Sequence, residues 1–120
     1  MILIHSNPAT RQAWDHMTDE ERIQFARDHI TLGERMAAAG ELVHSEGLPG
    51  PDQSTWVSVR DDEILATDGP YAEVKEYLAG FYVVDCADLD RAVHYAAQLP
   101  EAASSQVEVR PIFDLSTLDL

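Results

Sequence analysis

Three features of the sequence could carry chemistry: a histidine, an aspartate in a turn, and a lysine shortly after that turn. His29 interrupts a segment whose apolar residues recur at helical spacing. Asp68 opens the turn Asp68-Gly69-Pro70-Tyr71, and Lys75 follows it. An imidazole titrates near neutral pH, and a carboxylate beside it can fix its tautomer for proton transfer. We therefore expect His29 and Asp68 to face one cleft as a catalytic acid–base pair.

The turn is expected to complete a binding site around this pair. Gly69 can adopt backbone angles that other residues avoid, so we expect it at positive φ, and Pro70 fixes its own φ. We expect Gly69, Pro70 and Tyr71 to border a substrate, and Lys75 to bind an anionic group on it.

A purely structural interpretation stays open for each of these residues. Turns of this composition are often only turns. A histidine on an apolar helix face can be a core residue bonded to a backbone carbonyl, because a buried polar group needs a partner. Lysines are mostly surface residues.

Composition excludes several classes of function. The 120 residues include 8 Lys and Arg against 22 Asp and Glu, a formal net charge of −14. Such a surface repels nucleic acid and anionic membranes, and no apolar run is long enough to span a bilayer. The single Cys86 forms no internal disulfide and the N-terminus lacks a basic export signal, so we expect a cytoplasmic protein. No cofactor fingerprint or metal-ligand spacing of histidines occurs, so we expect neither a cofactor nor a metal.

The element that positions His29 is a long helix. Thr18 and Glu21 have the spacing of a capping box, and Gly40 is a typical residue after a helix end, which predicts a helix to about residue 39. A loop with Asn7 and Pro8 is expected before it. At 100° per residue His29 falls in the middle of the apolar half of the helix. The other members of that half are Ile23, Phe25, Ala26, Ile30, Leu32, Met36 and Ala37.

The remaining chain reads as strands with one further helix. Residues 2–5, 41–46 and 107–110 are expected strands, and residues 55–60 with 64–66 form an expected hairpin. Residues 80–85 are nearly all apolar, which places them in the centre of the sheet. Asp88 can cap a second helix that ends at Pro100. Its apolar face comprises Leu89, Ala92, Val93, Ala96 and Leu99.

This order of elements predicts an α+β fold. Two helices on one face of an antiparallel sheet match the ferredoxin-like βαββαβ sandwich. We expect residues 1–113 to form a single domain and residues 114–120 to form a tail. The uncovered sheet face would be apolar, and monomers rarely tolerate an apolar patch of that size. The sequence therefore predicts a homodimer through the open sheet face.

The segment after the hairpin resembles a known family. Residues 66–82 read Ala-Thr-Asp-Gly-Pro-Tyr-Ala-Glu-Val-Lys-Glu-Tyr-Leu-Ala-Gly-Phe-Tyr. This is similar to the motif of the DGPF branch of the YCII-related proteins, in which an Asp-Gly-Pro-Phe turn precedes a Lys-Glu pair and a Gly-aromatic strand start. Here Tyr71 stands in place of the Phe. Residues 46–48 and 107–111 resemble the family's second strand exit and closing strand, so the resemblance covers nearly the whole chain.

The resemblance implies a dimeric α+β barrel type of assembly and leaves two functions open. Some relatives are lactone dehydrochlorinases for which a His and an Asp are the proposed acid–base pair. This would make the protein a cofactorless isomerase or lyase that binds a small metabolite in a helix–sheet cleft. Genes of the DGPF branch often neighbour genes for sigma factors, which would suit a non-catalytic ligand- or protein-binding module. A cleft shared by His29 and Asp68 would favour the enzyme.

Overall fold

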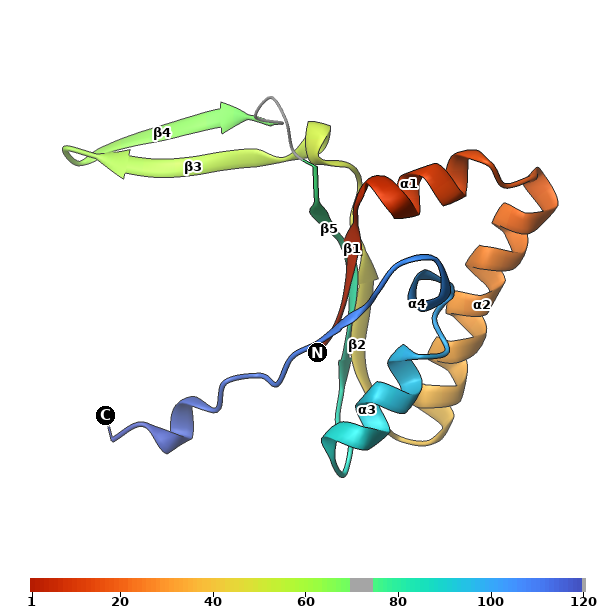
Figure 1. The fold of residues 1–120 in the computed structure, drawn as a ribbon. Coiled ribbons are helices and arrows are strands. Elements are labelled where there is room, and N and C mark those ends of the chain that lie inside the picture. Colours follow the sequence, from red (N-terminus) through yellow and green to blue (C-terminus); the bar gives the residue numbers. More distant parts are fainter. Residues whose placement is uncertain (70–74, 120) are drawn as a thin grey trace.

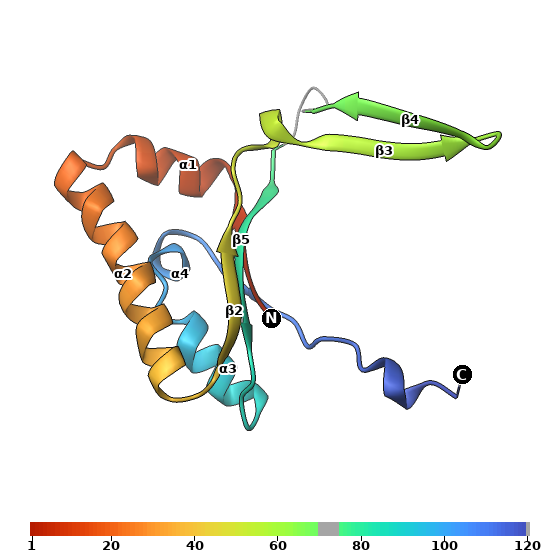
Figure 2. The same ribbon diagram turned by 180° about the vertical axis from the view of Figure 1, so that it is seen from behind.

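The structure is a computed structural model that describes residues 1–69 and 75–119 (Figure 1). It is a mixed α+β fold in which the α-helices cover one face of a four-stranded sheet, while the opposite face is open (Figures 1 and 2). The strands are β1 Ile2–Ser6, β2 Leu42–Gly47, β3 Thr55–Arg60, β4 Glu63–Asp68, β5 Tyr77–Val84 and β6 Glu108–Val109. The helices are α1 Pro8–Asp15, α2 Asp19–Ala38, α3 Leu89–Ala96 and α4 Pro100–Ser104, with 3-10 turns at Pro51–Gln53 and Leu115–Thr117.

The main sheet has the strand order β2-β5-β1-β6, and its neighbouring strands run antiparallel. The strand β5 lies between β2 and β1, which confirms the predicted central position of this apolar segment. The order is compatible with the predicted ferredoxin-like arrangement. Gly80 of β5 is paired with Ile4 of β1 on one side and with Gly47 of β2 on the other, so it lies in the ladders of both neighbouring strands.

The helix α2 begins at the predicted cap. The side chain of Thr18 accepts a hydrogen bond from the Glu21 amide, and Glu21 reaches back to the Thr18 amide. Leu32 and Met36 are buried against the sheet, and His29 lies one turn before Leu32 and two turns before Met36 on the same stripe. The buried face of α2 is narrower than the predicted apolar half of the helix, because Ile23 and Ile30 are 52% and 59% exposed.

A helix replaces the loop that was expected around Asn7 and Pro8. The side chain of Asn7 accepts a hydrogen bond from the Thr10 amide, the Thr10 hydroxyl accepts one from the Asn7 amide, and Pro8 occupies the first helical turn. Proline is favoured there because its missing N–H would have no partner in any case. The helix α1 therefore begins where the sequence predicted a loop, and it carries Arg11 beside the end of the sheet.

The second predicted helix is also divided differently. Asp88 caps α3 by accepting a hydrogen bond from the Arg91 amide, as expected, but Leu89 and Val93 are exposed. Pro100 does not simply end that helix; it begins α4, a five-residue helix. This short helix brings Glu101 against α2.

The core lies between the helices and the covered face of the sheet. The largest side chains with almost no exposure are Ile2, Leu32, Met36 and Leu99. They come from β1, α2 and the segment before α4. Burying an apolar side chain of this size stabilises the fold by about 1.5 to 3 kcal/mol, so this cluster fixes how α2 sits on the sheet.

The predicted hairpin exists, but it does not join the main sheet. Among the described residues, strands β3 and β4 pair only with each other (Figure 1), and all their residues are exposed. Asp61 and Asp62 have φ values of 52° and 64°, which suits the two-residue turn that follows the twist of a hairpin. The hairpin extends away from the sheet on its open side, as does the C-terminal segment (Figures 1 and 2).

Candidate functional site

His29 contacts a tyrosine and a glutamate, and the three residues come from three different elements. Its Nδ1 lies 2.8 Å from the Tyr82 hydroxyl, and its Nε2 lies 2.8 and 2.9 Å from the two carboxylate oxygens of Glu101. The helix α2 supplies His29, β5 supplies Tyr82 and α4 supplies Glu101. The side chain of His29 is 21% exposed and that of Glu101 is 9% exposed. The three residues therefore form one partly buried hydrogen-bonded chain.

Electrostatics fix how protons are arranged in this chain. Burial, and to a lesser extent the negative charge of Glu101, raises the pKa of Tyr82 to about 12. The phenol is therefore neutral at physiological pH. When His29 is neutral, its Nε2–H donates a hydrogen bond to Glu101, which leaves Nδ1 to accept a hydrogen bond from the Tyr82 hydroxyl. The carboxylate thus selects one histidine tautomer.

Two neighbouring cavities open beside this chain. One, of about 410 Å³, lies next to α1, and the other, of about 430 Å³, contains His29. Both are bordered by Phe25 and Glu101, together with Ile4 and Ala79 of the sheet. Glu101 is the buried charged side chain among the described residues, and it faces both cavities. Volumes of this size suit a small-molecule ligand.

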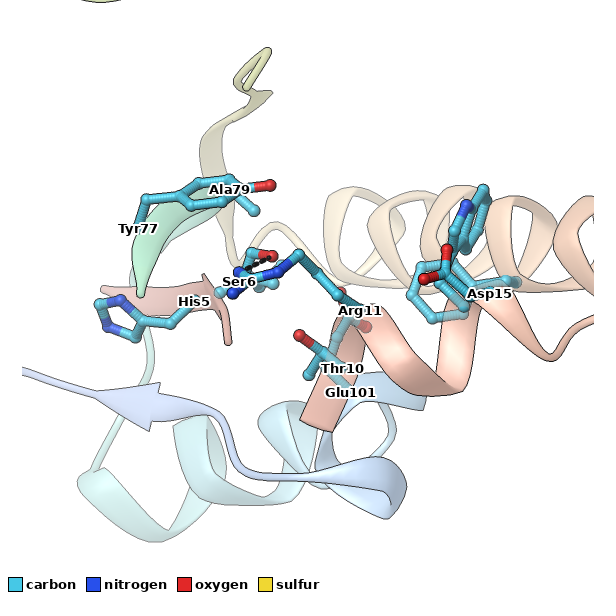
Figure 3. A pocket seen from close by; sticks show the side chains of 11 residues that line it. His5, Ser6, Thr10, Arg11, Asp15, Tyr77, Ala79 and Glu101 are labelled. Atoms are coloured by element: carbon cyan, nitrogen blue, oxygen red, sulfur yellow. Dashed lines mark hydrogen bonds between the residues drawn. The ribbon is translucent and has the colours of Figure 1, made fainter. Parts of the chain in front are cut away.

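The cavity next to α1 combines a cation with an aromatic wall (Figure 3). The Arg11 guanidinium donates from Nη1 to the Ser6 hydroxyl at 3.2 Å and from Nη2 to the Lys75 carbonyl at 2.7 Å. Its Cζ lies 5.6 Å from the centroid of the Tyr77 ring. Further along the wall, the rings of Trp14 and Phe25 meet edge to face, with centroids 5.5 Å apart.

The structure does not bring Asp68 to His29, and the expected pairing is wrong. Asp68 is the last residue of β4, where it is exposed and lies opposite Thr55 of β3. It is not among the residues that line the cavity of His29. The reason is topological: the hairpin leaves the body of the protein instead of packing under α2. Glu101 takes the place that was assigned to Asp68.

Gly69 is not at positive φ, so the reason given for a glycine there is also wrong. Its amide donates to the Ser54 carbonyl at 2.7 Å. A Cβ at this position would lie 2.7 Å from the carbonyl oxygen of Pro51. Gly69 is thus needed for a close approach of two backbone segments at the base of the hairpin.

The other predicted binding residues have separate outcomes. Pro70 and Tyr71 lie outside the described residues. Lys75 lines a different cavity, between the loop 48–54 and the start of β5, and its carbonyl holds Arg11. The cation that faces the cavity beside Glu101 is therefore Arg11.

Sequence reasoning missed Glu101, Tyr82 and Arg11. Tyr82 alternates with Phe81 in the central strand, so its position on the helix-covered face could have been read from the period of two. Glu101 follows Pro100, where the sequence predicts a helix end, although proline also begins helices. Arg11 could not be assigned to the site from the sequence, because it lies on α1, and the Asn7 cap that begins this helix was not predicted.

Fold and site together define a small α+β domain with a cleft between sheet and helices and a histidine–carboxylate pair in its wall. The chain belongs to the YCII-related domain family, whose family model matches residues 1–116. It is 32% identical over 113 residues to an uncharacterised protein of Rhizobium meliloti (strain 1021), in an alignment that covers 92% of this chain and 89% of the relative. None of the helices in the described part of the chain has the length and apolar character to cross a membrane.

Proposed function

We propose that the protein binds a small metabolite in the helix–sheet cleft and moves a proton on it. The observation that supports this proposal is the position of Glu101, which is held by His29 and faces both cavities. A carboxylate that borders a ligand cavity can act as a general base toward a carbon acid bound there.

The chemistry that fits is proton abstraction next to a carbonyl, by an isomerase or a lyase. The C–H bond of the ligand breaks and its proton goes to Glu101, while the electron pair enters the carbonyl system. Return of the proton to another carbon completes an isomerisation, and departure of a leaving group completes an elimination. His29 keeps the carboxylate in place through Nε2–H, and Tyr82 keeps the imidazole in place.

The test starts from a ligand that remains bound during purification. Native mass spectrometry of the purified chain, followed by denaturation, identifies small molecules that the protein retains. That compound is then incubated in D₂O with the wild type, Glu101→Gln and His29→Gln. We expect deuterium incorporation or product only with intact Glu101, and a loss of at least 100-fold in Glu101→Gln. Equal rates for wild type and Glu101→Gln would sink the acid–base proposal.

A non-catalytic ligand-binding module is the second candidate. Both nitrogens of His29 already have partners, Tyr82 and Glu101, which is also what a structural histidine would show. The Asp68-Gly69-Pro70-Tyr71 motif supports membership of the DGPF branch, and with it a role beside sigma factors. In that case the retained ligand would bind equally well to Glu101→Gln and would exchange no proton.

We further propose that the protein is a homodimer joined through the open sheet face. Tyr82 faces the helices, so alternation along β5 places Phe81 on the other face, where its ring lies 6.2 Å from that of His44. The radius of gyration is 17.1 Å, against about 13.6 Å for a compact domain of this length. The excess comes from two extended segments, the β3–β4 hairpin and the C-terminal segment.

A second copy of the chain fits this surface best. An isolated two-stranded hairpin is at best marginally stable in water, and this one exposes apolar side chains such as Val59 and Ile64 (67% and 73%). Six residues of strand span about 20 Å, whereas packed sheets lie about 10 Å apart. With the two open faces together, each hairpin would therefore pass beside the partner's sheet and be covered by it.

A further inference from the structure

The cavity next to α1 contains a cation whose partners, in the part of the chain that the structure describes, are neutral. Arg11 donates to the Ser6 hydroxyl and to the Lys75 carbonyl. None of the ion pairs formed between described residues includes it. A guanidinium has five N–H donors, and these two bonds leave donors for a ligand.

The geometry holds Arg11 in place before any ligand arrives. The hydroxyl and carbonyl contacts fix both terminal nitrogens, and the Tyr77 ring lies beneath the guanidinium carbon at 5.6 Å. Figure 3 shows the side chain running from α1 across the cavity toward Ser6. A fixed planar guanidinium suits a carboxylate, because less side-chain freedom is lost when two parallel hydrogen bonds form.

The rest of the cavity is built for an apolar body of about the size of a ring. Trp14, Phe25 and Tyr77 supply aromatic surface, and Ile4 with Ala79 forms the floor on the sheet. The cavity volume is about 410 Å³. An apolar wall with a few polar groups that fix orientation is the usual composition of a small-molecule site.

We propose that Arg11 makes this cavity a binding site for a small carboxylic acid with an apolar, ring-sized body. The inference rests on the proposed function, since it names the class of ligand that would present a carbon to Glu101. The acid group would lie at Arg11, and the apolar body would extend along Trp14 and Phe25 toward the wall that both cavities share.

Other charged groups border the same cavity and define the competing outcome. Asp15 and Glu101 are acidic, and His5 also lines the cavity, although its ring points away from Arg11 in Figure 3. If Asp15 and Glu101 determined which ligand binds, the preferred ligand would be an amine. A ligand chosen by the apolar wall alone would bind equally well with or without a charge.

Three probes of one shape separate these outcomes: phenylacetate, its neutral amide phenylacetamide, and 2-phenylethylamine. Binding to the full chain is measured by isothermal titration calorimetry or by shifts of tryptophan NMR signals. We expect phenylacetate to bind at least 10-fold more tightly than the other two. Equal binding of acid and amide would overturn the inference, as would a preference for the amine.

Variants of two neighbouring cations locate the effect. Arg11→Gln should weaken phenylacetate binding at least 10-fold and leave phenylacetamide unchanged, whereas Arg11→Lys should recover part of the affinity because it keeps the charge but loses the fork. Lys75→Gln is the matched control, since it keeps the carbonyl that holds Arg11, and it should bind like the wild type. Loss of binding in Lys75→Gln but not in Arg11→Gln would contradict the assignment.

Failure of this inference differs from failure of the proposed function. If none of the probes binds, the carboxylic-acid class is wrong, while a ligand retained during purification can still exchange a proton at Glu101. If the probes bind as expected but the retained ligand shows no exchange, the site recognises acids without the acid–base chemistry.

Discussion

The two faces of the main sheet carry similar side chains but differ in what covers them. On the helix side, Ile2 and Tyr82 are buried, and His29 pairs with Glu101. On the open side lie Leu3, which is 8% exposed, and the partly buried Phe81, and His5 pairs with Glu108 at 2.9 Å. Each face thus combines apolar side chains with a histidine–glutamate pair, yet the α-helices cover only one of the two faces.

The two pairs differ in what balances the charge of the carboxylate. Glu108 also accepts hydrogen bonds from Arg110, at distances down to 2.6 Å, and the bonds from His5 and Arg110 lower the pKa of its carboxyl. Among the described residues Glu101 has no arginine or lysine within ion-pair distance. Glu108 is thus paired with a permanent cation, whereas the partner of Glu101 is an imidazole. The comparison therefore favours the helix side as the site of chemistry and the open side as an interface.

The largest expected effect is on assembly. Phe81→Arg places a charge in the middle of the open sheet face, where a buried charge has no partner. We expect the wild type to run as a dimer of the 13.3 kDa chain and the variant to run as a monomer at micromolar concentration in light scattering. Ile23→Arg, on the exposed side of α2, should remain dimeric. A monomeric wild type would refute the assigned role of the open face.

The helix-side pair should contribute far more to stability than the open-side pair. Glu101→Ala leaves the His29 Nε2–H without its acceptor in a half-buried site, so we expect the free energy of unfolding to fall by about 2 to 4 kcal/mol. Glu101→Gln keeps an acceptor of the same shape and should cost about half as much. Urea unfolding monitored by circular dichroism measures both.

Glu108→Ala is the matched change on the other face. Its carboxylate is partly exposed, and Arg110 can return to water when it is removed. We expect a clearly smaller loss of stability than for Glu101→Ala. Equal losses would remove the distinction between the two pairs.

The sequence predicted the parts of this comparison that depend on local patterns. The Thr18–Glu21 cap, the central position of β5 and the Asp88 cap are confirmed, because each follows from hydrogen bonds or apolar runs within a few residues. It also placed His29 on the covered side of α2. The predicted partner of His29, Asp68, was wrong because Asp68 and Glu101 are both far from His29 in sequence. Which of the two reaches it depends on whether the hairpin packs on the body.

The hairpin itself shows the same limit. Alternating residues and a two-residue turn predicted β3 and β4 correctly, since pairing between neighbours is local. The alternation within β3 and β4 does not predict whether the hairpin joins the main sheet. Edge pairing is decided by long-range geometry, which here includes the close approach of Gly69 to Pro51 and Ser54 at the base of the hairpin.

A smaller effect is expected at the base of the hairpin. Gly69→Val puts a side chain within 2.7 Å of the Pro51 carbonyl oxygen, so the backbone must shift, at a cost of about 1 to 3 kcal/mol. We expect a shifted hairpin, a dimer that dissociates about 10-fold more readily, and an unchanged helix-side core. Sedimentation over a dilution series reports the dissociation. Gly47→Ala is the control, because nothing lies within 4 Å of a Cβ there.

The smallest effect is confined to acid and concerns Glu41, which joins the helix side to β2. Hydrogen bonds from Arg91 and Tyr95 lower the pKa of its carboxyl to about 2, with the bond from Arg91 as the largest cause. A carboxyl whose pKa is lowered by folding stabilises the fold above its unfolded pKa of about 4.5, and this contribution is lost as the pH falls toward 2. The wild type should therefore lose stability through this window more steeply than Glu41→Gln, which has no charge to lose there, while the two should respond alike to pH between 6 and 8. Thermal unfolding at pH 8, 6, 4.5, 3.5 and 2.5 gives both slopes, and parallel curves for the two proteins would show that Glu41 is already free of Arg91 in solution.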